Sequence, residues 1–187
     1  MGRVVVTEFI SLDGVIEDPG GAEGYAHGGW AFEIGDEGGS FKFDELKASD
    51  AQLLGRVTYE GFAKAWPTME GTGAFGEKMN AMPKFVVSTT LKDPEWNNTT
   101  VLSGDLADEV GKLKQQFEGD ILVAGSAQLV QSLLAGGLID ELRLMVFPVV
   151  LGAGKRLFAG GADATALKLV ETRQTGAVAI LTLAKSD

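Results

Sequence analysis

The order of apolar and polar positions divides the chain into two parts. Before Gly137, short apolar runs rich in β-branched residues alternate with longer segments in which apolar residues recur every three or four positions. The short runs predict strands at residues 4–10, 51–54, 84–88, 99–102 and 120–124. The longer segments predict helices at residues 41–48, 57–66, 105–117 and 125–134. This alternation favours an α/β protein with a mainly parallel sheet.

After Gly137 the pattern contains strands alone. Residues 140–150 predict a long strand that Pro148 interrupts. Residues 166–174 and 177–183 are expected to pair as a hairpin around Gly176. The sequence therefore predicts eight strands, mostly parallel, with antiparallel strands added at one edge.

A glycine-rich segment separates the first strand from the first long helix. Residues 20–39 contain eight glycines interleaved with His27, Trp30 and Phe32, so we expect a long loop. Such a loop is a lid, a binding loop or a disordered segment, and the aromatic residues argue against pure disorder. Trp30 and Phe32 either form the wall of a substrate pocket or fasten the loop to the core. His27 is either a solvated loop residue or a proton donor.

Composition narrows the function classes. The 187 residues predict one domain spanning 1–187, and they include no cysteine and a single histidine, which excludes thiolate catalysis, zinc–sulfur sites and a two-histidine metal site. The formal charge of −10, with no basic cluster, argues against nucleic-acid binding. Since no apolar run approaches the ~20 residues that span a bilayer, we expect no membrane association and a cytoplasmic location.

Three predicted strands end in turns that carry glycine or hydroxyl side chains. The turns are Gly55, Arg56, Val57 and Thr58; Ser88, Thr89 and Thr90; and Ala124, Gly125, Ser126, Ala127 and Gln128. In an open α/β sheet, ligands bind beyond the carboxyl ends of the strands, where helix N-termini present free N–H groups.

These turns suit a phosphorylated cofactor. Glycine at position 125 lets the backbone approach a pyrophosphate closely, and Arg56 with Ser88 and Thr89 suits a separate phosphate, such as the 2′-phosphate that distinguishes NADP from NAD. The alternative is that each segment is an ordinary turn and helix cap.

Five segments together resemble the dihydrofolate reductase-like superfamily. The resemblance is closer to its riboflavin-biosynthesis branch, the C-terminal domain of the bifunctional riboflavin deaminase/reductase. The segments are 11–16 (SLDGVI), 54–60 (LGRVTYE), 123–126 (VAGS), 137–142 (GLIDEL) and 147–152 (FPVVLG). They span nearly the whole chain.

The resemblance implies a three-layer fold and NADPH as the cofactor. Gly55, Arg56 and Thr58 would line its phosphates, with Arg56 on the 2′-phosphate, and residues 124–128 would cradle the pyrophosphate. Val15 and Ile16 would lie against the nicotinamide. By the same analogy we expect a homodimer and a small-molecule substrate.

The implied activity is hydride transfer from NADPH to a C=N or C=O group of a small heterocyclic or phosphosugar substrate, similar to that of 5-amino-6-(5-phosphoribosylamino)uracil reductase. Folate reductases carry a substrate-binding carboxylate on the first helix, and here Gly38, Gly39 and Ser40 occupy the nearest positions, while Met145 stands where they place a threonine. The alternatives are a non-catalytic NADP(H)-binding protein, or a dihydrofolate reductase whose acid has diverged.

The proton needed for reduction has three candidate sources: Asp13, a loop carboxylate such as Asp36, or water. Asp13 stands in a strand-to-loop turn, where aspartate also commonly binds its own backbone. Met145 and Phe147 alternate with polar residues on their strand, and they serve either a dimer interface or the core.

Overall fold

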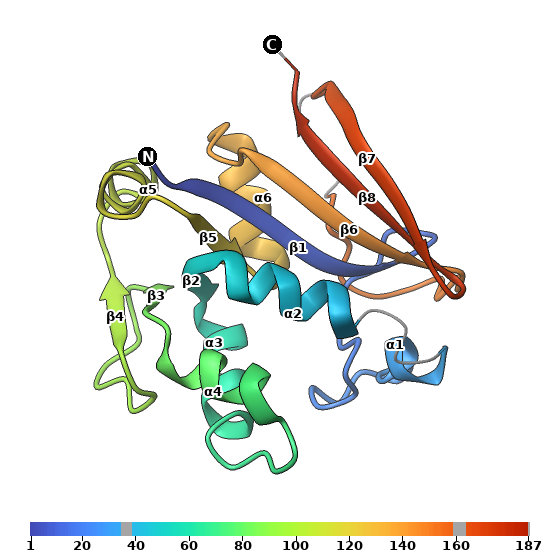
Figure 1. Cartoon of the computed structure of the whole chain (residues 1–187), viewed down its shortest axis with the longest axis horizontal. Helices are drawn as coiled ribbons and strands as arrows, with labels where there is room; N and C mark the ends of the chain where they lie inside the picture. Colours follow the sequence, from blue (N-terminus) through green and yellow to red (C-terminus); the bar gives the residue numbers. More distant parts are fainter. Residues whose placement is uncertain (35–38, 159–163, 187) are drawn as a thin grey trace.

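The computed structural model describes residues 1–34, 39–158 and 164–186, and its central element is an eight-stranded sheet (Figure 1). The strands are β1 (Arg3–Ser11), β2 (Ser49–Gly55), β3 (Lys84–Val87), β4 (Thr99–Leu102), β5 (Asp120–Val123), β6 (Glu141–Phe147), β7 (Leu167–Thr175) and β8 (Val178–Lys185). Their order across the sheet is β4-β3-β2-β5-β1-β6-β8-β7. Five of the pairings are parallel, and the pairings of β8 with β6 and with β7 are antiparallel. The predicted fold class is confirmed.

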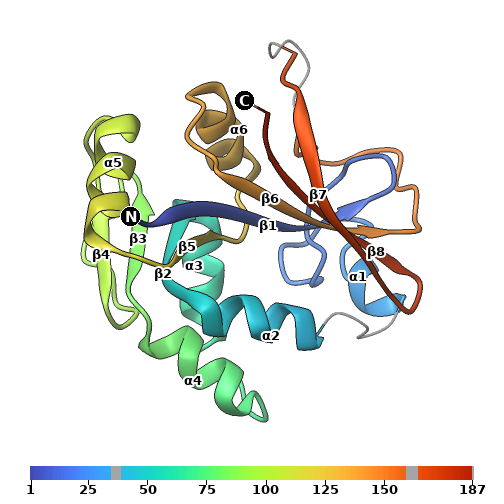
Figure 2. The same cartoon turned by 45° about the horizontal axis from the view of Figure 1, so that its top comes forward.

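Helices cover both faces of the sheet. They are α1 (Trp30–Glu33), α2 (Gly39–Ala48), α3 (Arg56–Ala65), α4 (Gly73–Ala81), α5 (Leu106–Gln116) and α6 (Ala127–Ala135). Figure 2 shows α5 and α6 above the sheet and α2 and α4 below it. The expected three layers are present.

Each face of the sheet has its own core. Val4, Val6 and the buried side chains of α5 and α6 form one cluster. Val5 and the buried side chains of α2, α3 and α4 form another. Because successive residues of a strand point to opposite faces, the run of valines in β1 supplies both cores.

The carboxyl half of β1 is paired on one side only. The pairing of β1 with β5 ends at Val6 and Val123, whereas its pairing with β6 continues to Ser11. The two chains are thus unpaired beyond Val6 and Val123, and this unpaired interval between β1 and the chain that leaves β5 is called the opening.

The structure departs from the sequence-based expectation in three places. Within residues 20–39, which were expected as a long loop, Trp30–Glu33 form the short helix α1. Helix α4 was not predicted, since its sequence, GAFGEKMNA, contains two glycines and few regularly spaced apolar residues. The suggestion that Met145 and Phe147 serve a dimer interface was wrong: both are buried, and they pack with Trp30 and Val178 in a third cluster.

Within the described residues, no helix is long and apolar enough to cross a membrane.

Candidate functional site

The turns that follow β2 and β5 lie against each other at the carboxyl edge of the sheet. The two strands are parallel neighbours, so their carboxyl ends share one edge. A Cβ built at Gly55 would lie 2.5 Å from Ser126 Oγ, and a Cβ at Gly125 would lie 3.3 Å from Thr58 Oγ1. Glycine is therefore required at position 55, because the two turns approach each other too closely for a side chain. At Gly125, φ is +76°, which favours glycine over other residues.

The first turn presents a helix N-terminus beside a cation. No side chain caps the first turn of α3, so its leading N–H groups remain available. Arg56 is exposed, and its Nη1 donates to Glu60 Oε1 and Oε2 at 2.9 Å. Val57 is exposed and Thr58 is half-buried. A positive helix end and a guanidinium suit a phosphate group.

The turn after β3 lies next to the first, since β3 pairs with β2 through Val87 and Gly55. Ser88 Oγ accepts hydrogen bonds from the backbone N–H groups of Thr90 and Leu91, at 3.1 and 2.9 Å. Ser88 therefore shapes the turn, while Thr89 and Thr90 are exposed beyond it. The structure brings this turn and Arg56 to the same edge.

The turn after β5 runs directly into α6. Ser126 Oγ accepts from Leu129 N at 3.3 Å and caps the helix, and the Gly125–Ser126 peptide bond is cis. Residues 124–127 are half-buried, and Gln128 is exposed. Ser126 thus caps the helix, as the alternative interpretation of this turn expects. It also contacts the neighbouring turn.

Asp13 joins two loops. Its Oδ1 accepts from Ser11 Oγ at 2.7 Å and from Leu151 N at 3.1 Å, and its Oδ2 accepts from Gly152 N at 2.8 Å. The hydrogen bond from Ser11, followed by that from Leu151, lowers the pKa of Asp13 to about 2. Such a carboxylate holds structure and is a poor proton donor at neutral pH, so these contacts argue for the structural alternative.

Val15 and Ile16 are both buried: Val15 is fully enclosed, and Ile16 belongs to the core beneath α6. Their backbones are also engaged, since Val15 O accepts from Ser11 N and Ile16 N donates to Lys155 O. Side-chain contact with a nicotinamide requires this segment to move. The contact stays a prediction.

The glycine-rich loop is fastened by its aromatic residues. Trp30 Nε1 donates to Glu17 O at 2.9 Å, and the Trp30 ring packs edge-on against Phe147 at 5.4 Å. Trp30 is therefore a core anchor, whereas Phe32 is 63% exposed and free to contact a ligand. His27 is exposed beside Tyr25. Asp36, the second candidate acid, lies outside the described residues.

One buried acid was missed by the sequence analysis. Glu8 on β1 is only 6% exposed, and its Oε1 accepts from Gly125 N at 2.9 Å. Burial raises the pKa of Glu8 to about 8, while the charge of Lys42 and the hydrogen bond from Gly125 act in the opposite direction. A signal was available: Glu8 falls in the same alternate row as Val4, Val6 and Ile10, which all belong to one core.

A cluster of charges joins α2 to the sheet, and it was also missed. Thr7 Oγ1 donates to Glu45 Oε2 at 2.8 Å, and Lys42 Nζ contacts both of these residues. Arg143 on β6 lies 3.5 Å from Glu45 and 3.0 Å from Asp120. Arg3 and Glu141 also belong to this cluster. Its three cations are Arg3, Lys42 and Arg143, and its three anions are Glu45, Asp120 and Glu141. These residues hold the helix beside the carboxyl half of β1.

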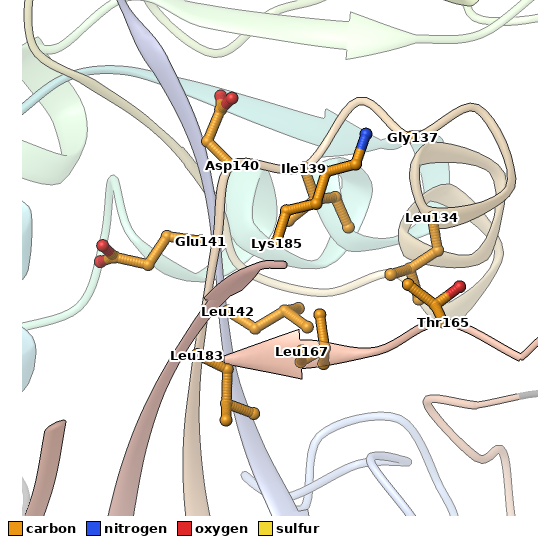
Figure 3. Close-up of a pocket in the computed structure, with 10 residues that line it drawn as sticks. All are labelled: Leu134, Gly137, Ile139, Asp140, Glu141, Leu142, Thr165, Leu167, Leu183 and Lys185. Carbon is orange, nitrogen blue, oxygen red and sulfur yellow. The ribbon is translucent and has the colours of Figure 1, made fainter. Parts of the chain in front are cut away.

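An apolar cavity lies at the other end of the sheet, at the start of β6 (Figure 3). Its volume of about 40 Å³ suits one or two water molecules and is far too small for a dinucleotide. The lining residues are Leu134, Gly137, Ile139, Asp140, Glu141, Leu142, Thr165, Leu167, Leu183 and Lys185. We therefore place the candidate ligand site at the carboxyl edge and not here.

Solved structures share this fold. A protein from Shewanella sp. PV-4, named as a candidate riboflavin biosynthesis protein, superimposes with a TM-score of 0.77 at 20% identity, with 99% of each chain covered. A dihydrofolate reductase from Enterococcus faecalis, solved in complex with NADP(H), superimposes with a TM-score of 0.58 at 15% identity, covering 99% of this chain and 97% of the other. The fold is that of the dihydrofolate reductase-like proteins.

Residues 3–181 match the model of the RibD C-terminal domain, and the chain belongs to that family. A relative of similar length is the uncharacterized protein YyaP of Bacillus subtilis (strain 168). It is 31% identical over 174 residues, covering 91% of this chain and 88% of YyaP. The resemblance seen in the sequence is confirmed.

Proposed function

We propose that the protein is an NADPH-dependent reductase that acts on a C=N or C=O group of a small heterocyclic or phosphosugar substrate. The observation that carries the proposal is the close apposition of Gly55 and Ser126, which joins two turns suited to phosphates. Family membership supports it. When bound, NADPH supplies the hydride.

The residues present fit such a cofactor. The uncapped N-terminus of α3 and the guanidinium of Arg56 offer donors for the 2′-phosphate, with Ser88 and Thr89 beside them. Gly125 to Gln128 offer a backbone turn and a helix N-terminus for the pyrophosphate. The protein's part is to hold the cofactor against the substrate and to exclude water.

Replacing Arg56 tests the cofactor assignment. Arg56→Ala should weaken NADPH binding by tenfold to over a hundredfold, because a charge-assisted phosphate contact contributes roughly 1.5–3 kcal/mol, and it should leave NADH binding nearly unchanged. The measurement is thermal unfolding at matched concentrations of each cofactor, since a ligand at a hundred times its dissociation constant adds about 2.7 kcal/mol.

The matched control is Arg173→Ala. Arg173 pairs with Glu171 on the edge strand β7, away from the three turns, so this variant should bind both cofactors as the parent protein does. Equal losses of NADPH and NADH in Arg56→Ala would refute the assignment of Arg56 to the 2′-phosphate.

A non-catalytic NADP(H)-binding protein is the second candidate. The observation that favours it is the absence of an acidic residue from the first turn of α2, where folate reductases were expected to carry their carboxylate. The same observation weakens the third reading, a dihydrofolate reductase with a diverged acid. Oxidation of NADPH with an acceptor separates a reductase from a pure binder. The homodimer and the cytoplasmic location stay predictions.

A further inference from the structure

The opening between β1 and β5 lies where the chain changes direction across the sheet. After β1 the chain passes through α2 on one face and reaches β2, and after β5 it passes through α6 on the other face and reaches β6. Crevices of this kind, at the carboxyl ends of strands whose connections leave on opposite faces, bind ligands in open α/β sheets. Beyond Val6, no described strand pairs with the side of β1 that faces β5.

Glu8 bridges this opening. Its Oε1 accepts from Gly125 N at 2.9 Å, so the carboxyl group spans from β1 to the turn proposed to hold the cofactor. Among the described residues, Glu45 Oε1 and Gln52 Oε1 are the buried side-chain polar atoms without a hydrogen-bond partner. Glu8 is 6% exposed, and the described residues form one hydrogen bond to its carboxyl group, through Oε1.

The position of Glu8 is costly for a purely structural residue. It continues the row of Val4 and Val6 toward Ile10, where an apolar side chain would pack without penalty. Burying a carboxyl group there costs free energy that one backbone hydrogen bond offsets only in part. A buried titratable group at the carboxyl ends of the strands, hydrogen-bonded to the turn proposed to hold the cofactor, is typical of a functional acid.

The surroundings of Glu8 keep it protonated near neutral pH. Burial raises its pKa to about 8. Two groups lower the pKa of Glu8: the charge of Lys42 on α2 and the hydrogen bond from the Gly125 N–H, which follows β5. Both favour the ionised form, but burial outweighs them. Asp13, the other acid near the end of β1, is ionised and engaged by three donors.

We propose that Glu8 is the proton donor of the reduction. The inference rests on the proposed reductase function. The Glu8 O–H bond breaks and an N–H or O–H bond forms on the acceptor, while the acceptor carbon gains the hydride and NADPH is oxidised to NADP⁺. The Glu8 carboxylate then regains a proton from water through the opening.

The variant that tests this role is Glu8→Gln. The amide oxygen still accepts from Gly125 N, but the side chain no longer carries a transferable proton. With 5-amino-6-(5-phosphoribosylamino)uracil or 7,8-dihydrofolate as acceptor, kcat for NADPH oxidation should fall about 10²- to 10⁴-fold, while the Kd for NADPH changes less than about twofold. The matched control, Glu171→Gln on the exposed strand β7, should keep the parent kcat.

The pH profile supplies a readout that a structural role would not change. In the parent protein kcat should decline above pH 8, as Glu8 loses its proton, and in Glu8→Gln the residual rate should not show this decline. If Glu8→Gln does not fold, a ¹³C NMR titration of the parent protein replaces it: one glutamate carboxyl should titrate near pH 8, and titration of all of them below pH 6 would refute the proposal.

The outcomes separate the two proposals. NADPH oxidation by the parent protein with an unchanged kcat and pH profile in Glu8→Gln overturns only the role of Glu8. If Glu8→Gln loses both NADPH binding and activity, Glu8 has a structural role, and its role as proton donor is overturned. No oxidation of NADPH by the parent protein with either acceptor overturns the reductase and the proton donor together.

Discussion

The carboxylate of Glu60 lies 2.9 Å from Nη1 of Arg56, one helical turn along α3, and holds the cation that we assign to the cofactor's 2′-phosphate. Both side chains are close to half exposed. A phosphate that binds Arg56 must therefore compete with Glu60, and it also meets the negative charge of that residue.

Glu60→Gln should strengthen NADPH binding by about twofold. An exposed pair at this spacing is worth about 0.3–0.5 kcal/mol, and its removal releases Arg56 for the phosphate. The stability of the free protein should fall by no more than that amount. Isothermal titration with NADPH and NADH measures the effect, which should be larger for NADPH.

A control for the loss of a helical ion pair is Glu109→Gln, which removes the pairing of this residue with Lys112 on α5. This variant should leave both affinities unchanged. Weaker NADPH binding in Glu60→Gln would mean that Glu60 itself contributes to the site.

Gly55→Ala should damage the site by steric contact alone. The backbone at Gly55 has φ −78° and ψ 155°, which any residue adopts, but the added Cβ would lie 2.5 Å from Ser126 Oγ and 2.8 Å from Ser126 Cβ. We expect the free energy of unfolding to fall by about 1–3 kcal/mol and the stabilisation by NADPH to be lost. Urea denaturation with and without NADPH measures both.

Gly61→Ala is the control on the same helix. A Cβ at Gly61 meets nothing within 4 Å, so alanine in this helix interior should stabilise the protein by about 0.5–1 kcal/mol and leave NADPH binding intact. If Gly55→Ala binds NADPH as the parent does, the two turns do not form one site.

Asp13→Asn should lower the melting temperature at pH 7 and have little effect in strong acid. The folded-state pKa of Asp13, about 2, lies below its ordinary value of 3.8, so its contribution to stability is present above pH 4 and is lost as the pH falls toward 2. Melting curves of both proteins between pH 2 and 7 should converge at the acid end. A gap that is independent of pH would show that the charge of Asp13 does not matter.

The sheet was predictable because most of its strands are short apolar runs bounded by polar residues or glycine. Residues 84–88 and 120–124, for example, were expected as strands and form β3 and β5. The sequence also predicted a helix that begins at Asp105. In the structure the Asp105 side chain caps α5 by accepting hydrogen bonds from Ala107 N and Asp108 N. These features depend on neighbours within a few positions.

The contacts of Glu8 and Arg143 were not predictable because their partners are distant in the sequence. Glu8 contacts Gly125, 117 positions away; its place in the same row as Val4 and Val6 indicates burial but not this partner. Arg143 stands between Leu142 and Leu144, as a residue of a polar strand face would, yet it is enclosed by Asp120 of β5 and Glu45 of α2. Tertiary packing alone decides which charged residues of a strand become buried.

Different kinds of contact hold the two helices that flank the candidate site, α6 and α2. Helix α6 is held by Leu129, Val130 and Leu133, whose burial is insensitive to salt and to pH. Beside β1, α2 is held by the buried Leu46 and also by Lys42 and Glu45, which belong to a group of six charges. Ionic strength should therefore act on one side of the candidate site more than on the other, because dissolved salt screens pairs of charges.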